Sequence, residues 1–133
     1  VGTQPEQANA VKIARNFLLA TVIESLGEAF SLIRKSAIAP DVFLNILTST
    51  SLSAPVYKNY GKQMVERAYE PAQFSMELGL KDVELALATA REKGVSLPTA
   101  DLIRKNLIEA IAAGHGHKDW AALAEFIGST GSG

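Results

Sequence analysis

The chain has 133 residues, with 13 Lys or Arg, 14 Asp or Glu and a formal net charge of -1. This near balance excludes the basic surplus that neutralises nucleic-acid phosphates. Hydrophobic residues make up 47% of the chain and cysteine is absent, which excludes intrinsic disorder, disulfides and thiolate metal sites. The length fits one domain. We expect a soluble cytoplasmic protein that binds neither nucleic acid nor a membrane.

The first predicted element is a long helix over residues 5–35. Pro5 and Glu6 are typical of a first helical turn, and apolar residues then recur at helical spacing as far as Ile33. Residues 17–23 are apolar on nearly every side, which indicates a helix surrounded by protein. This uncharged run is too short to span a bilayer. About 30 residues make a helix roughly 45 Å long, so we expect a central helix that reaches a second subunit or domain.

Shorter helices are predicted along the rest of the chain. Prolines, glycines and hydroxyl-rich breakers separate them, and no segment shows the sustained two-residue alternation of a strand. In chain order these helices cover residues 40–48, 55–67, 74–93, 97–114 and 119–126. The sequence therefore predicts an all-α domain, a bundle of about six helices over residues 1–127 with a flexible tail over residues 128–133. Because the chain starts at Val1 and not at Met, we expect a fragment or a processed chain.

Two pairs of polar residues are candidates for catalysis or ligand binding. Lys12 and Asn16 lie four residues apart, hence on one helix face, where a lysine can donate a proton to a carbonyl oxygen and an asparagine can orient it. On spacing alone, a solvated lysine near a helix start is the commoner explanation. Lys81 and Asp82 interrupt an apolar helix face, either as a lysine facing a cofactor or substrate or as an exposed charge pair.

Other polar groups are weaker candidates. Glu24 and Glu28 are spaced for a carboxylate pair, but no histidine pattern accompanies them, so a buried capping or interface role is preferred. His115, His117 and Asp119 have the residue types of a metal trio, yet glycine-flanked histidines near a helix end are usually surface residues. We predict no metal site. The chain also has neither G-x-G-x-x-G nor a P-loop motif, so it encodes no cradle for nucleotide phosphates.

Several segments together resemble a known family. The pattern Lys12-x-x-x-Asn16, the run at 23–30, the segment from Phe74 to Val83, and the segments at 97–100 and 114–120 are similar to the C-terminal helical domain of β-hydroxyacid dehydrogenases. This is the 3-hydroxyisobutyrate dehydrogenase-like group, which is related to 6-phosphogluconate dehydrogenase. The combination of K-x-x-x-N with F-x-x-x-x-x-x-K-D at this separation is more specific than either motif alone.

The resemblance implies roles for four residues. Lys12 matches the family's catalytic lysine and Asn16 its substrate-binding asparagine, whereas Phe74 and Lys81 match residues on the nicotinamide side of the cleft. It further implies a preceding Rossmann domain that binds most of the NAD or NADP, a small hydroxyacid or aldehyde substrate, and a homodimer. This chain alone is then expected to be inactive.

Two alternatives remain open. One is a non-catalytic helical dimerisation module. The other is an imine reductase on the same scaffold, although relatives of that kind usually replace the lysine that Lys12 matches. The presence of Lys12 therefore favours hydroxyacid or aldehyde chemistry.

Overall fold

The structure, a computed structural model, describes residues 5–130 and is all-α over that range. Its α-helices are α1 (Pro5–Lys35), α2 (Pro40–Thr48), α3 (Pro55–Glu66), α4 (Met76–Lys93), α5 (Pro98–Ala110) and α6 (Leu123–Thr130). A π-helical turn (Ile111–His115) and a 3-10 turn (Trp120–Ala122) connect α5 to α6. The predicted six-helix architecture with a long first helix is confirmed.

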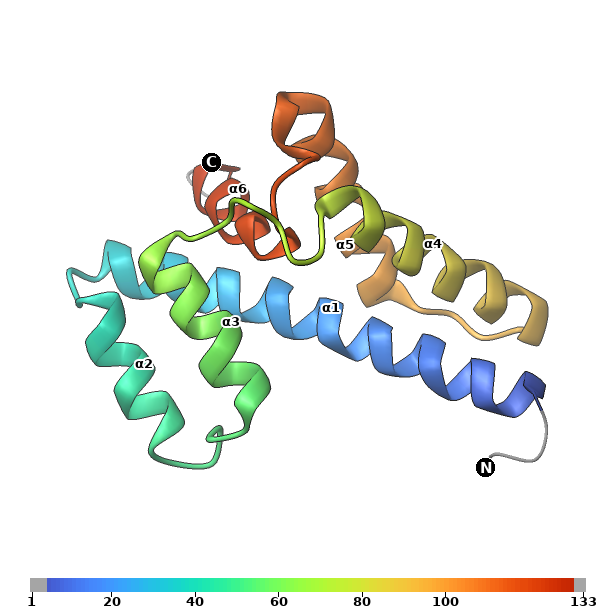
Figure 1. The fold of residues 1–133 in the computed structure, drawn as a ribbon, viewed down its shortest axis with the longest axis horizontal. Helices are drawn as coiled ribbons and strands as arrows, with labels where there is room; N and C mark the ends of the chain where they lie inside the picture. Colours follow the sequence, from blue (N-terminus) through green and yellow to red (C-terminus); the bar gives the residue numbers. More distant parts are fainter. Residues whose placement is uncertain (1–4, 131–133) are drawn as a thin grey trace.

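The long helix α1 crosses the molecule from end to end, and the other helices pack along it (Figure 1). α2 and α3 lie side by side at one end, α4 and α5 lie beside the N-terminal part of α1, and α6 covers its other half. The buried side chains from these helices form one continuous core. Its large members include Ile23, Leu26, Phe30, Met64, Met76, Ile103, Leu107, Trp120 and Leu123.

Two glycines allow close approach of neighbouring elements. A Cβ atom at Gly27 of α1 would lie 2.9 Å from the Cα atom of Ala124 in α6, so a side chain there would push these two helices apart. A Cβ atom at Gly79 of α4 would lie 2.6 Å from Cε3 of Trp120. The indole can therefore pack this closely against α4 only because residue 79 has no side chain.

Local chemistry explains where the helices begin and end. α2, α3 and α5 each begin with a proline, which has a suitable φ angle and lacks an N–H that the first turn would leave unpaired. The Ser75 hydroxyl accepts a hydrogen bond from the Leu78 N–H at 3.2 Å and so caps α4. Gly94 ends α4 in the left-handed conformation, with φ of 70°.

Three predicted boundaries were wrong. Phe74 does not belong to the helix that follows it, because the Ser75 cap fixes the first turn at Met76. The predicted helix over 97–114 ends as a regular α-helix at Ala110 and continues as a π-helical turn, in which Gly114 has φ of 99°. α6 extends to Thr130 and so includes the first three residues of the predicted tail. Residues 131–133 lie outside the described part of the chain.

The first helix is less enclosed than its composition suggested. Within the apolar stretch 17–23 only Ala20 and Ile23 are buried, and Leu18 is 60% exposed. The expectation of a helix surrounded by protein was therefore wrong for this chain on its own. One face of α1 packs into the core, and the opposite face presents apolar side chains outward.

By length and composition alone, α1 is able to cross a membrane, since its most apolar 18-residue window has a mean hydropathy of 1.4. The central helix of a protein core has the same composition, so this feature is weak evidence for a membrane span. In the structure, α1 contacts each of the other α-helices, and its Leu26 and Phe30 are buried in the common core. The contacts identify α1 as the core helix of this domain.

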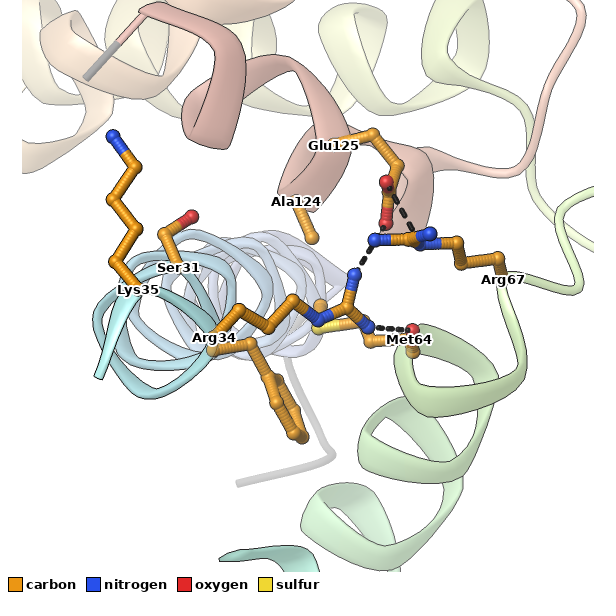
Figure 2. A pocket seen from close by; sticks show the side chains of 8 residues that line it. Ser31, Arg34, Lys35, Met64, Arg67, Ala124 and Glu125 are labelled. Carbon is orange, nitrogen blue, oxygen red and sulfur yellow. Dashed lines mark hydrogen bonds and ion pairs between the residues drawn. The ribbon is translucent and has the colours of Figure 1, made fainter. Parts of the chain in front are cut away.

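An ion network joins the C-terminal part of α1 to α3 and α6 beside a hollow of about 210 Å³ (Figure 2). Glu125 accepts a hydrogen bond from the Tyr69 hydroxyl at 2.8 Å and pairs with Arg67 Nε at 3.1 Å and Arg34 Nη1 at 3.7 Å. Arg34 also donates from Nη2 to the Met64 carbonyl oxygen at 2.9 Å. Burial, followed by the Glu125 carboxylate, raises the pKa of Tyr69, which stays protonated as the donor.

Candidate active site

Lys12 and Asn16 lie one turn apart on α1, as their spacing predicted. Lys12 is exposed and Asn16 is half-buried. Arg15, which lies between them, donates a long hydrogen bond of 3.4 Å from Nη1 to the Asn16 Oδ1. Because residues four apart in an α-helix lie one above the other, the two residues share one face of α1.

Phe74 lies in the loop before α4, and Asp119 holds this loop in place. The buried Asp119 carboxylate, only 2% exposed, accepts hydrogen bonds from the N–H groups of Gln73 at 3.0 Å and Phe74 at 3.2 Å. Its other oxygen accepts from the Ala121 N–H at 3.0 Å. The Phe74 ring meets Trp120 edge-on, with ring centroids 4.8 Å apart. One carboxylate therefore positions both aromatic rings.

The structure brings Phe74 and Lys81 to the same surface. Both line an open hollow of about 570 Å³, together with Leu78 and Leu85 of α4. Asp82 and Glu84 also line the hollow, so its lining combines an apolar wall with one exposed ammonium, that of Lys81, and two carboxylates. Lys12 and Asn16, on α1, are not among the residues that line it.

A second hollow, of about 580 Å³, lies between α1, α3 and the Phe74 loop. Arg15 and Leu19 of α1, Tyr60 of α3 and Gln73 of the loop are among the residues that line it. Gln73 and Phe74 are adjacent residues, and each lines one of the two hollows. The Phe74 loop thus lies between the hollow lined by Lys81 and the hollow lined by Arg15.

Tyr60 and Asp119 have roles here that the sequence did not reveal. The Tyr60 hydroxyl accepts a hydrogen bond from Trp120 Nε1 at 3.2 Å, and burial raises its pKa. Asp119 was considered from sequence only as a metal ligand. An aspartate before a short helical turn is a recognisable cap, but its bonds to Gln73 and Phe74 join segments about 45 residues apart.

The candidate metal trio is not assembled. His117 Nε2 lies 3.4 Å from a Glu70 carboxylate oxygen at the surface, whereas Asp119 is buried and bonded to backbone N–H groups. Over residues 5–130, no three His, Asp or Glu side chains gather closely enough to hold a metal ion.

Glu24 is buried between α1 and α5, and Glu28 is exposed. The Asn106 amide donates a hydrogen bond of 2.9 Å to the Glu24 Oε1 atom. Burial raises the pKa of Glu24 to about 7, with a hydrogen bond from protonated Glu24 to Glu28 acting in the same direction and the Asn106 hydrogen bond acting against it. The carboxyl group is therefore partly protonated near neutral pH.

Glu24→Gln is expected to make the folded protein less sensitive to pH. Folded Glu24 binds its proton more tightly than unfolded Glu24, so its contribution to stability is present below about pH 4.5 and is lost as the pH rises through about 7. The glutamine stays neutral and still accepts from Asn106. Its thermal midpoint should exceed that of the wild type by a few degrees near pH 8 and match it near pH 5. Glu92→Gln, at an exposed site on α4, is the matched control; equal pH profiles for wild type and Glu24→Gln would contradict the assignment.

Comparison with known proteins gives a consistent family. The family model described as "NAD-binding of NADP-dependent 3-hydroxyisobutyrate dehydrogenase" matches residues 7–127. The chain is 44% identical over 127 residues to an uncharacterized oxidoreductase, YfjR, of Bacillus subtilis, covering 96% of this chain and 44% of that protein. It is 30% identical over 117 residues to glyoxylate/succinic semialdehyde reductase 1 of Arabidopsis thaliana, covering 88% of this chain and 40% of that protein.

Comparison with a solved structure supports the same family. A crystal structure of 3-hydroxyisobutyrate dehydrogenase from Salmonella typhimurium superposes with a TM-score of 0.80 at 25% identity, covering 86% of this chain and 40% of that chain. The present chain thus spans less than half the length of the relatives it matches. It belongs to the 3-hydroxyisobutyrate dehydrogenase-like family of β-hydroxyacid dehydrogenases and corresponds to the C-terminal NAD-binding domain of its members.

Proposed function

We propose that this chain is the catalytic helical domain of an NAD(P)-dependent oxidoreductase that interconverts a small β-hydroxyacid, or a similar alcohol, with its carbonyl form. The observation that carries the proposal is the Lys12–Asn16 pair on an outward face of α1, in a domain whose family is named for NAD binding. The printed names of its relatives support the substrate class, since they include glyoxylate/succinic semialdehyde reductases and L-threonate dehydrogenases.

Lys12 and Asn16 have the chemistry that this reaction requires. When bound, the nicotinamide cofactor exchanges hydride with the substrate carbon. The Lys12 ammonium donates a proton to the carbonyl oxygen as that oxygen gains negative charge, and in the reverse direction the neutral Lys12 amine accepts the hydroxyl proton. The Asn16 amide, one turn away, hydrogen-bonds the substrate and keeps it oriented toward Lys12.

Phe74 and Lys81 are suited to the cofactor side of the cleft. Phe74, Leu78 and Leu85 form an apolar wall against which one face of a nicotinamide ring can pack. Lys81 adds one positive charge to a lining that also holds the Asp82 and Glu84 carboxylates. The residues present therefore fit the group. The chain has no glycine-rich phosphate loop, so we assign the pyrophosphate contacts, and the choice between NAD and NADP, to a Rossmann domain of the complete enzyme.

We further propose that the enzyme acts in the cytoplasm as a homodimer joined through its helical domains. The exposed apolar side chains on α1 and α2, among them Leu18, Leu32, Val42 and Ile46, support this arrangement because they leave water when a second copy covers them. Light scattering of the chain should give the mass of two copies. A folded monomer at high concentration would contradict the proposal.

The proposed function is tested with the complete enzyme. Purified full-length protein should reduce NAD or NADP in the presence of a small β-hydroxyacid such as 3-hydroxyisobutyrate, whereas the isolated chain should bind NADPH negligibly in a calorimeter and show no turnover. Micromolar NADPH binding by the isolated chain would contradict the assignment of the pyrophosphate contacts to a Rossmann domain. A full-length protein that dimerises but oxidises no hydroxyacid would instead be a non-catalytic dimerisation module.

A further inference from the structure

The hollow between α1 and α3 is lined by hydrogen-bond donors that the domain itself leaves unused. Arg15 makes only the long contact of 3.4 Å with its neighbour Asn16 and forms no ion pair within residues 5–130. Tyr60 accepts from Trp120, so the proton of its own hydroxyl is free to be donated elsewhere. Such a concentration of donors is suited to an anionic group.

The charges of the residues that line this hollow also favour an anionic ligand. Arg15 and Lys62 carry positive charges and Glu66 carries the one negative charge among the lining residues, which leaves a single positive charge in excess. Among the described residues, neither Lys62 nor Glu66 is paired in an ion bridge. A singly charged carboxylate matches this balance better than a dianionic phosphate.

The position of Arg15 relative to Lys12 sets the size of the ligand. Residues three apart on a helix are separated by about 4.5 Å along its axis and face the same side. Lys12, Arg15 and Asn16 therefore share one face of α1. A small molecule whose reacting oxygen lies at Lys12 needs only a short extension to reach the Arg15 guanidinium.

We propose that the hollow receives a second carboxylate of the substrate, and that Arg15 is the residue that selects hydroxydicarboxylates over hydroxymonocarboxylates. The planar guanidinium binds a carboxylate through two parallel hydrogen bonds, and the Tyr60 hydroxyl supplies a third donor. The inference rests on the proposed function, since it assumes that the reacting carbon lies beside Lys12. It adds the substrate class, which the family resemblance leaves undefined.

The test uses the full-length enzyme and two alcohols of equal length, 3-hydroxyglutarate and 3-hydroxypentanoate, which differ in having a carboxylate or a methyl group at the far end. The wild type should show the lower KM for 3-hydroxyglutarate. In Arg15→Gln this KM should rise at least tenfold more than the KM for 3-hydroxypentanoate, and Arg15→Lys should recover part of the difference. Lys58→Gln removes a positive charge from α3 outside the hollow and should leave the ratio of the two KM values unchanged.

The outcomes separate this inference from the function on which it rests. Equal KM changes for both alcohols in Arg15→Gln, or a wild type that prefers 3-hydroxypentanoate, would overturn the role of Arg15 while the dehydrogenase activity stands. A wild type that oxidises neither alcohol nor any other β-hydroxyacid would overturn the proposed function, and the role of Arg15 with it. Circular dichroism of each variant confirms that a changed KM does not reflect unfolding.

Discussion

Replacing Lys12 with alanine in the complete enzyme is expected to lower kcat by roughly 10²-fold or more, the usual size of a lost general acid. The ammonium is the only proton donor that we assign to the reacting oxygen, so its loss leaves water to protonate the developing alkoxide. The fold should be unaffected, because Lys12 is exposed on α1 and contributes nothing to the core. The thermal midpoint should therefore stay within a few degrees of the wild type.

Lys12→Arg separates two explanations for such a loss. A guanidinium keeps the positive charge but does not release its proton near neutral pH, so this variant should also be nearly inactive if Lys12 is the proton donor. Lys58→Ala, at an exposed position on α3, controls for the loss of a surface charge and should retain full turnover. Near-normal turnover in Lys12→Arg would reduce Lys12 to a residue that binds a carboxylate through its charge.

The helical architecture could be predicted because its boundaries depend on residues close together in sequence. Pro40, Pro55 and Pro98 mark the first turns of α2, α3 and α5, and Gly94 ends α4. The predicted start of α4 differs from the structure because apolar periodicity extends back to Phe74, whereas the capping hydroxyl of Ser75 sets the boundary at Met76. The cap joins residues only three apart, so the sequence itself contains this signal.

The extent of burial along α1 could not be predicted in the same way. Apolar periodicity indicates which face of a helix is covered by protein. It does not indicate whether the covering residues belong to the same domain or to another domain or subunit. Leu18 is apolar yet 60% exposed, whereas Ile23, five residues later, is buried. The difference depends on where α4, α5 and α6 happen to pack.

Only the part of the candidate site that depends on local spacing could be predicted from the sequence. Helical spacing places Lys12 and Asn16 on one face of α1, and the resemblance directed attention to Phe74 and Lys81, which the structure brings to one hollow. The second hollow depends on contacts between distant segments, such as the hydrogen bond between Tyr60 and Trp120, which are 60 residues apart. No local pattern encodes a contact of that range.

Asp119→Ala is the substitution expected to cost the most stability. It leaves three backbone N–H groups without their acceptor: those of Gln73 and Phe74, which are part-buried, and that of Ala121, which is buried. Each unsatisfied buried donor costs about 1 to 3 kcal/mol. Because two of the three are only part-buried, the loss should lie toward the lower end of their sum, at about 3 to 5 kcal/mol, a fall of roughly 10 °C or more in the thermal midpoint. Asp101→Ala, in the exposed first turn of α5, removes only a favourable helix-dipole interaction and should cost less than about 1 kcal/mol.

The same substitution should disturb the candidate site before it unfolds the domain. Trp120 is the only tryptophan in the chain, and its indole packs against Phe74 and donates to Tyr60. Once Asp119 no longer holds the Phe74 loop, this ring loses its neighbours, and the tryptophan emission should shift to longer wavelength at temperatures where circular dichroism still reports intact helices. Asp119→Asn retains one acceptor oxygen and should fall between wild type and alanine in both measurements. If emission and helicity change together in Asp119→Ala, the carboxylate stabilises the domain as a whole and does not specifically position the loop between the two hollows.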